Sequence, residues 1–215
     1  MPQPFGSLSR VDHIIVAGMP HTGKTPFASE LVEGGPAARA FGFTLAARRV
    51  VYFNSGRGWG HLGEKVTAED LADPGLLEGV CLRLVVEPGQ GDELLASFAK
   101  VDEACRVARA CGGLVLVVDE LADLNRAGGE PILRGLHRNG HHDGVATIFC
   151  SPCWTDFPAR CRSTASRVFS FFQRSDDDVR TLDAELGRQV PGFGARAASW
   201  RFPQPPVAWV SPALH

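Results

Sequence analysis

The sequence lacks any hydrophobic run long enough to cross a membrane. Its longest apolar runs, such as residues 114–118, have the length of a strand, whereas a membrane-spanning helix needs about 20 apolar residues. Residues 1–10 are polar and contain proline, and they lack the basic start and apolar core of a secretory leader. We therefore expect a soluble, intracellular protein with no segment inserted in a membrane.

A strong net charge is missing as well. The formal net charge is −2 at pH 7, which disfavours a protein that coats nucleic acid through bulk positive charge. A ring of subunits can still hold DNA with a few residues from each subunit, so the charge does not exclude that class. Residues 134–174 contain six arginines and two aspartates. This segment either faces phosphate groups or forms a solvated surface.

Signs of a disulfide framework and of internal repeats are also missing. The chain has six cysteines, and without a secretory leader these fit reduced thiols better than disulfides. The 215 residues are 44% hydrophobic and 21% charged, which is ordinary for a soluble folded protein. This length is enough for one α/β domain with its own core.

What the sequence does contain is an alternation of short apolar segments with longer helical ones. In residues 92–111 apolar side chains recur every three or four positions, which indicates a helix that Gly112 and Gly113 end. Residues 114–118 form an unbroken apolar run, typical of a central strand buried on both faces. The pattern predicts an α/β fold with a mainly parallel sheet flanked by helices. Strands are predicted at residues 13–17, 50–54, 81–87, 114–118, 145–150 and 168–172, and helices at residues 25–32, 92–111 and 176–188.

A phosphate-binding pattern, GxxxxGK[ST], follows the first predicted strand and precedes a helix. Its glycines let the backbone curl so that several N–H groups point at phosphate oxygens, and the helix N-terminus adds its positive dipole end. Lys24 would contact the β- and γ-phosphates of ATP, and the Thr25 hydroxyl would bind Mg²⁺. The predicted nucleotide-binding residues are Gly18, Met19, Pro20, His21, Thr22, Gly23, Lys24 and Thr25.

Two acids follow the apolar run at residues 114–118. Asp119 would hold the Mg²⁺ of a triphosphate, and Glu120 would take a proton from the attacking water, as hydrolytic P-loop enzymes require. The elements predicted between residues 50 and 111 also place an additional strand between the two motifs along the chain. These features predict a RecA-like P-loop NTPase domain of the additional-strand, catalytic-glutamate class.

The segment at residues 118–124, Val-Asp-Glu-Leu-Ala-Asp-Leu, resembles the second nucleotide motif of FtsK/HerA-type DNA translocases. The segments that follow have the same order as in that family. They are a basic segment at residues 136–145, expected to be a turn, then a strand ending in a polar sensor, and then the segments 154–158 and 168–172. The resemblance covers residues 11–188. Compact members of this family are genome-packaging ATPases of membrane-containing icosahedral double-stranded DNA viruses, and the chain looks most like these.

This resemblance implies a homo-oligomeric ring, expected to be a hexamer, that uses ATP and Mg²⁺ to translocate double-stranded DNA into a preformed capsid. Its partners would be double-stranded DNA, bound without sequence preference, other copies of the chain, and viral capsid or vertex proteins. Its location would be the host cytoplasm and the packaging vertex of the virion. A cellular or plasmid FtsK/HerA-like translocase, a small-molecule kinase and a non-catalytic nucleotide-dependent assembly switch remain alternatives.

Two positions depart from the family pattern. Where relatives carry arginine in the turn before the sensor strand, this chain has His141, so Arg138 or Arg134 would act on the neighbouring subunit's nucleotide. Where relatives end that strand in Thr-Gln, the chain has Ser151 and Pro152. Proline cannot offer the amide that would orient the attacking water or the γ-phosphate. Ser151 would keep part of this sensor role. The expected catalytic residues are Glu120, Lys24, Arg138 and Ser151.

The cysteines at positions 150, 153 and 161 and the histidines at 137, 141 and 142 suggest a zinc or redox site. A strand at residues 145–150 would, however, hold His142 and Cys150 about 20 Å apart, too far for one coordination shell. Buried thiols are therefore the expected state of these cysteines.

Two further segments interrupt the alternation of strands and helices. The glycine-rich residues 56–63 either form a plain loop or present Arg57, Trp59 and His61 to a DNA backbone. Four prolines in residues 202–212 predict an extended tail that lies along its own domain or reaches a neighbouring subunit. We divide the chain into an N-terminal extension at 1–10, the ATPase domain at 11–190 and a Pro-rich tail at 191–215.

Overall fold

The computed structural model describes residues 12–36, 39, 49–54, 61–77, 82–88, 92–108, 114–201 and 204–210. The strands are β1 (His13–Ala17), β2 (Arg49–Asn54), β3 (Glu64–Val66), β4 (Leu82–Val86), β5 (Leu114–Asp119), β6 (Val145–Ser151), β7 (Arg167–Ser170) and β8 (Val207–Val210). The helices are α1 (Lys24–Glu33), α3 (Pro74–Leu77), α4 (Asp92–Ala108), α5 (Leu121–Arg126), α6 (Glu130–Asp143), α7 (Ala159–Thr164), α8 (Asp176–Leu186) and α9 (Phe193–Ser199), with 3₁₀ turns η1 (Asp70–Ala72) and η3 (Trp154–Asp156).

All these strands belong to one eight-stranded sheet in the order β3-β4-β2-β5-β6-β1-β7-β8. Every neighbouring pair is parallel except β7 and β8, which are antiparallel. Parallel strands connected through helices have all their carboxyl ends at one edge, where ligands bind in open α/β sheets. The sheet and its flanking helices confirm the predicted α/β fold class.

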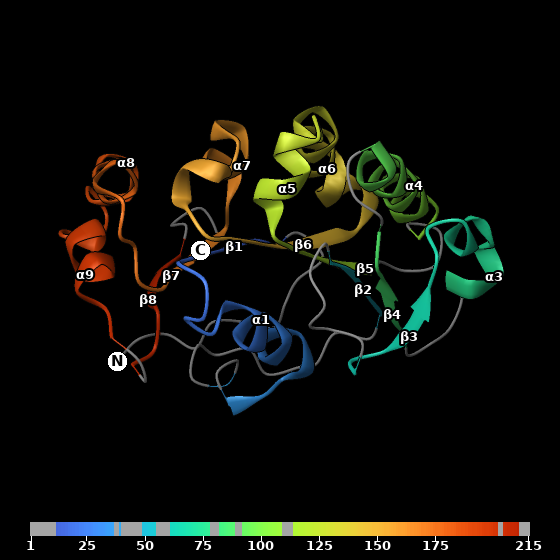
Figure 1. The fold of residues 1–215 in the computed structure, drawn as a ribbon, viewed down its shortest axis with the longest axis horizontal. Coiled ribbons are helices and arrows are strands. Elements are labelled where there is room, and N and C mark those ends of the chain that lie inside the picture. The colour runs from blue at the N-terminus through green and yellow to red at the C-terminus, as the bar shows by residue number, and fades with distance from the viewer. Residues whose placement is uncertain are drawn as a thin grey trace.

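Helices lie on both faces of the sheet (Figure 1). Helix α1 covers one face, and α4, α5, α6, α7 and α8 lie over the opposite one. Successive residues of a strand point to opposite faces, and the buried side chains follow this rule. Ile14 and Val16 of β1 pack in the cluster that contains Phe27 of α1, whereas Ile15 and Ala17 belong to the cluster on the other face. The fully buried central strands explain the apolar runs in the sequence.

Strand β6 lies between β1 and β5 in the sheet. Its residues pair with both neighbours, so that Ile148 is opposite Ile14 of β1 and Val117 of β5. An inserted strand therefore separates the phosphate-loop strand from the strand that carries the acids. The strands predicted between the two motifs along the chain, at residues 50–54 and 81–87, lie instead beyond β5 as β2 and β4.

A turn was predicted for the basic segment at residues 136–145, and this prediction is wrong. Residues up to Asp143 form the carboxyl-terminal part of α6, and Gly144, with a φ of 69°, reverses the chain into β6. The amphipathic pattern around Leu133 and Leu136, both buried, accounts for the helix. His141 and Arg138 are therefore helical positions, and their side chains lie outside the described residues.

The carboxyl-terminal segment adds regular structure to the domain. Residues 193–199 form α9, and residues 207–210 form β8, which pairs with β7 so that Trp209 is opposite Val168. Within the Pro-rich tail of residues 191–215, residues 193–199 are thus helical, whereas residues 207–210 are extended and lie along the sheet of their own chain. Residues 1–10 and Arg57 and Trp59 of the glycine-rich loop lie outside the described residues. No helix in the described ranges is both long and apolar enough to span a membrane.

Candidate nucleotide-binding site

The phosphate loop joins the end of β1 to the start of α1, and its glycines have backbone angles that other residues adopt at a cost. Gly18 has a φ of 148° and Gly23 a φ of 95°. A Cβ atom at Gly18 would also lie 2.6 Å from Cβ of Phe171. His21 is one of two non-glycine residues in the described part of the chain with a positive φ, 62°. The loop is therefore tightly curled, as a phosphate cradle requires.

Neighbouring strand ends hold the beginning of the loop in place. The Gly18 amide donates to the Ser151 carbonyl at 3.2 Å, and the Met19 amide donates to the Phe172 carbonyl at 3.0 Å. Ser151 ends β6, and Phe172 follows β7, so the loop is fixed on both sides of β1. Such fixed amides need no rearrangement to receive an anion.

Lys24 lies across the loop that precedes it. Its side chain is 5% exposed, and Nζ donates to the Met19 carbonyl at 3.0 Å, beside the Thr22 hydroxyl, which donates to the same oxygen at 2.7 Å. Lys24 is the first residue of α1, whose N-terminal dipole end favours a bound anion. In this position the ammonium group can contact the terminal phosphates of a nucleotide.

The two predicted metal ligands face each other at the carboxyl edge of the sheet. The Thr25 hydroxyl donates to Asp119 Oδ2 at 3.1 Å. Asp119 is 7% exposed, and its Oδ1 accepts the amide of Glu120 at 3.2 Å. A hydroxyl and a carboxylate beside a phosphate loop are the oxygen donors that Mg²⁺ takes in P-loop proteins. The residues present therefore fit a magnesium ion.

Glu120 has a backbone conformation that a glutamate seldom adopts. Its φ is 55° and its ψ 52°, which places it in the left-handed region at the N-cap of α5. Its side chain is half-buried, and burial, followed by the neighbouring Asp119 carboxylate, raises its pKa. A raised pKa makes the carboxylate a stronger base, and backbone strain at a site edge is a common mark of a functional residue.

Ser151 lies at the end of β6, but its hydroxyl has a protein partner. The side chain is fully buried, and Oγ donates to Asp156 Oδ2 at 2.6 Å. The same carboxylate oxygen accepts the Cys153 amide at 3.1 Å, while the Asp156 carbonyl accepts the Asn125 side-chain amide from α5. Asp156 also adds to the raised pKa of Glu120. Asp156 is therefore the hydrogen-bond partner of the Ser151 hydroxyl in this structure.

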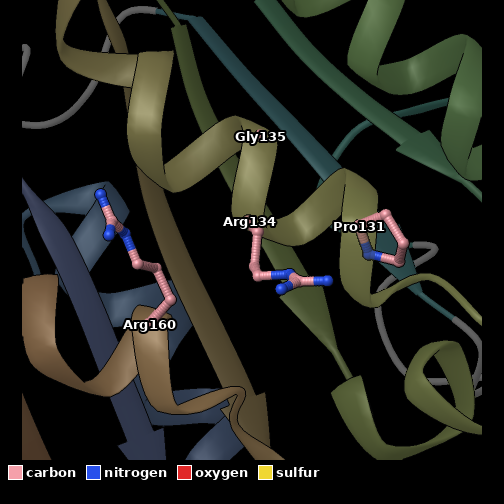
Figure 2. A pocket seen from close by; sticks show the side chains of 4 residues that line it. All are labelled: Pro131, Arg134, Gly135 and Arg160. Carbon is pink, nitrogen blue, oxygen red and sulfur yellow. The ribbon is translucent and has the colours of Figure 1, made fainter.

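The arginines expected to act on a neighbouring subunit belong to a different part of the molecule. Arg134 is exposed on α6, with Nε 3.6 Å from Glu130 Oε1. Together with Pro131, Gly135 and Arg160 of α7 it lines an open pocket of about 350 Å³. In Figure 2 the Arg134 side chain extends towards Pro131, and Arg160 extends away from Arg134. The two guanidinium groups do not converge on one point within this chain.

The cysteines resemble buried core residues more than metal ligands. The cysteines in the described ranges that form no disulfide are Cys105, Cys150, Cys153 and Cys161, all buried except the half-buried Cys153. Burial raises the pKa of Cys161 to about 12. The described residues contain no cluster of three or more His, Cys, Asp or Glu side chains arranged to hold a metal.

The structure thus brings Lys24, Thr25, Asp119 and Glu120 together around one loop and keeps Arg134 away from them. Sequence reasoning missed Asp156 and Asn125. One signal for Asp156 was present, because Cys153 and Asp156 have the spacing of a capping box, and η3 shows both of its hydrogen bonds. The Asn125 contact joins residues 31 positions apart and has no local signal.

No protein-family model matches the sequence, and no curated protein matches it. Among solved structures, the fold is similar to the genome packaging NTPase B204 from Sulfolobus turreted icosahedral virus 2 in complex with ATP-gammaS, with a TM-score of 0.62 and 16% identity over 89% of each chain. The DNA-packaging ATPase B204 from Sulfolobus Turreted Icosahedral Virus matches with a TM-score of 0.59 and 17% identity over 88% of each chain.

A secretion protein has the same kind of domain. Thermomonospora curvata EccC, ATPases 2 and 3 in complex with a signal sequence peptide, matches with a TM-score of 0.54 and 19% identity, over 90% of this chain and 35% of that one. At these identities the structural similarity shows the fold alone: the chain has the same P-loop ATPase fold as these viral packaging and secretion proteins.

Proposed function

We propose that this protein is a Mg²⁺-dependent ATPase that moves double-stranded DNA and packages a viral genome into a preformed capsid. The observation that carries the hydrolytic part is the contact of Thr25 with Asp119, with Glu120 directly beyond it. A small-molecule kinase needs the loop and the metal ligands but no base for water. The strained and partly buried Glu120 therefore favours hydrolysis over transfer to an acceptor.

Each residue of the site has one part in this reaction. The loop amides and Lys24 bind and orient the β- and γ-phosphates. When bound, Mg²⁺ would be held by Thr25 and Asp119 and would neutralise charge that develops on the phosphates. Glu120 takes the proton of the attacking water. Asp156 holds the end of β6 by accepting hydrogen bonds from the Ser151 hydroxyl and the Cys153 amide.

Ring assembly can bring an arginine of a neighbouring subunit to the γ-phosphate site. In the described part of the chain, the exposed Arg134 lies on α6, a helix that covers the sheet face opposite α1 (Figure 1). A neighbouring subunit can offer Arg134 or Arg138 to that phosphate, a contribution that is large in related phosphoryl-transfer enzymes. A ring, with six subunits as our proposal, satisfies this requirement.

The packaging assignment is supported by the likeness to two B204 proteins, which extends over almost the whole of each chain. The proposed partners are other copies of the chain, DNA, and capsid or vertex proteins. The proposed locations are the host cytoplasm and the packaging vertex. Since the net charge is −2, DNA binding should be nonspecific, weak and sensitive to salt.

Phosphate release, measured with and without double-stranded DNA, tests this function. The wild-type protein should hydrolyse ATP faster with DNA, and Glu120→Gln should lose turnover while it still binds ATP. A matched control is Asp177→Asn, which removes an exposed acid on α8. Turnover that requires a small acceptor in place of water would establish a kinase. Nucleotide binding without any turnover would favour an assembly switch.

A further inference from the structure

The strand order predicts where the nucleoside end of a bound ATP lies, provided that the proposed function holds. Asp119 and Glu120 stand at the end of β5, on one side of β1, and β7 adjoins β1 on the other side (Figure 1). The metal and the attacking water act at the γ-phosphate, so this phosphate faces β5. An extended triphosphate then directs its ribose and base towards the segments that follow β7 and precede β8.

An aromatic ring and an exposed guanidinium group meet in these two segments. Phe172 follows β7 and Arg201 precedes β8, and Arg201 Cζ lies 5.2 Å from the centroid of the Phe172 ring. Phe172 is half-buried and Arg201 is exposed, so the pair presents a surface to solvent. The Phe172 carbonyl accepts the amide of Met19, which connects this surface directly to the phosphate loop.

The aromatic core next to the pair fixes its position. The ring of the adjacent Phe171 packs edge-on against Phe27 of α1 at 5.5 Å and against Trp200 at 5.3 Å. Arg201 Nη1 donates to the Trp200 carbonyl at 2.7 Å. Side chains that are already held in place lose little conformational entropy when a ligand binds.

We propose that Phe172 and Arg201 form the platform on which the nucleobase of ATP stacks. Bases stack on aromatic rings and on planar guanidinium groups, and neither contact reads the hydrogen-bonding edge of the base. The platform therefore accepts purine nucleoside triphosphates in general and distinguishes adenine from guanine only weakly. It contributes to the affinity for nucleotide and takes no part in the hydrolytic step.

Comparison of ATP with inorganic tripolyphosphate tests this proposal, because only ATP carries a base. Binding of each would be measured by calorimetry with Mg²⁺ in a Glu120→Gln background, so that turnover does not consume the ligand, for the otherwise wild-type chain and for Arg201→Ala and Arg201→Lys. Arg201→Ala should weaken ATP about 5- to 30-fold and change tripolyphosphate by less than about twofold. Arg201→Lys should show most of the same loss, since lysine keeps the charge but not the planar group. GTP should bind the wild type about as tightly as ATP does.

Arg188→Ala is the matched control, because Arg188 is also an exposed arginine of the carboxyl-terminal segment and should leave both affinities unchanged. Phe172→Leu gives a second route and should weaken ATP selectively. Equal losses for ATP and tripolyphosphate in the Arg201 variants would show a phosphate contact and overturn the platform. Unchanged ATP affinity in both Arg201→Ala and Phe172→Leu would overturn it too. A wild-type protein that binds neither ligand would refute the nucleotide site itself.

Discussion

Replacing Ser151 with alanine removes the hydroxyl that donates to Asp156 Oδ2 at 2.6 Å. A hydrogen bond to a charged group contributes about 1.5–3 kcal/mol to stability. Asp156 is half-buried and keeps the Cys153 amide as a donor, so water and that amide compensate part of the loss. We therefore expect the coupling between the two side chains to be about 1–2 kcal/mol.

A double-mutant cycle measures this coupling. The free energy of unfolding in urea would be determined for the wild type, Ser151→Ala, Asp156→Ala and the double variant. Effects that add to within about 0.5 kcal/mol would refute an interaction between the two side chains. A second cycle, Ser151→Ala with Tyr52→Phe, is the control. Tyr52 lies on β2, two strands away from β6 in the sheet, and its hydroxyl donates to Glu33.

The same variants separate two roles for Ser151 in hydrolysis. If the buried hydroxyl acts by holding Asp156, then Ser151→Ala cannot lower kcat more than Asp156→Ala does. Both should leave KM for ATP nearly unchanged, because the hydrogen bonds of these two side chains lie within residues 151–156 and not in the phosphate loop. A larger fall in kcat for Ser151→Ala would show that the hydroxyl contacts the reacting groups directly and would contradict the claim that Ser151 acts by holding Asp156.

Three further outcomes follow from single contacts. Gly18→Ala should destabilise the fold by about 2–4 kcal/mol and abolish ATP binding in a calorimetric titration, because its Cβ would lie 2.6 Å from that of Phe171 and its φ is 148°. Tyr52→Phe should lower the urea-unfolding free energy by about 1 kcal/mol, since the hydroxyl donates to Glu33 at 3.0 Å; no loss would show that this contact is dispensable. Burial, followed by the Asp178 carboxylate, raises the pKa of Cys153 to about 11. Its alkylation by iodoacetamide should therefore stay slow at pH 8.5 and accelerate only as the pH approaches 11, and fast reaction at pH 8.5 would refute this.

Much of the sheet could be predicted because its central strands are buried on both faces. Residues 114–118 and 145–150 show as apolar runs for that reason, and both are strands in the structure. β3 was missed because it is only three residues long and largely polar, with burial that depends on its contact with β4. β8 was missed because prolines precede it, and proline is tolerated beside an antiparallel edge strand such as this one.

The phosphate loop and the two acids could be located because their spacing is fixed by local geometry. The loop needs glycines at Gly18 and Gly23, where φ is positive, and the acids directly follow a buried strand. The position of Ser151 was predicted, but the direction of its hydroxyl was not. That direction depends on η3, which turns Asp156 back towards the end of β6, and no periodic pattern predicts such a turn.

The strand order places the end of β6 next to the nucleotide site, between the phosphate loop and the acids that follow β5. The two sequence motifs alone do not show this. β6 pairs with β1 and with β5, so its last residue adjoins both the phosphate loop and the strand of the acids. The Ser151 carbonyl accepts from Gly18, and its hydroxyl reaches Asp156, which in turn accepts from Asn125 of α5. α5 begins directly after Glu120. The end of β6 is therefore bonded both to the phosphate loop and, through Asp156, to the helix that follows Glu120. Thr155 of the same 3₁₀ turn is bonded to the buried Asp178 of α8, so this one turn also connects α8 with the end of β6.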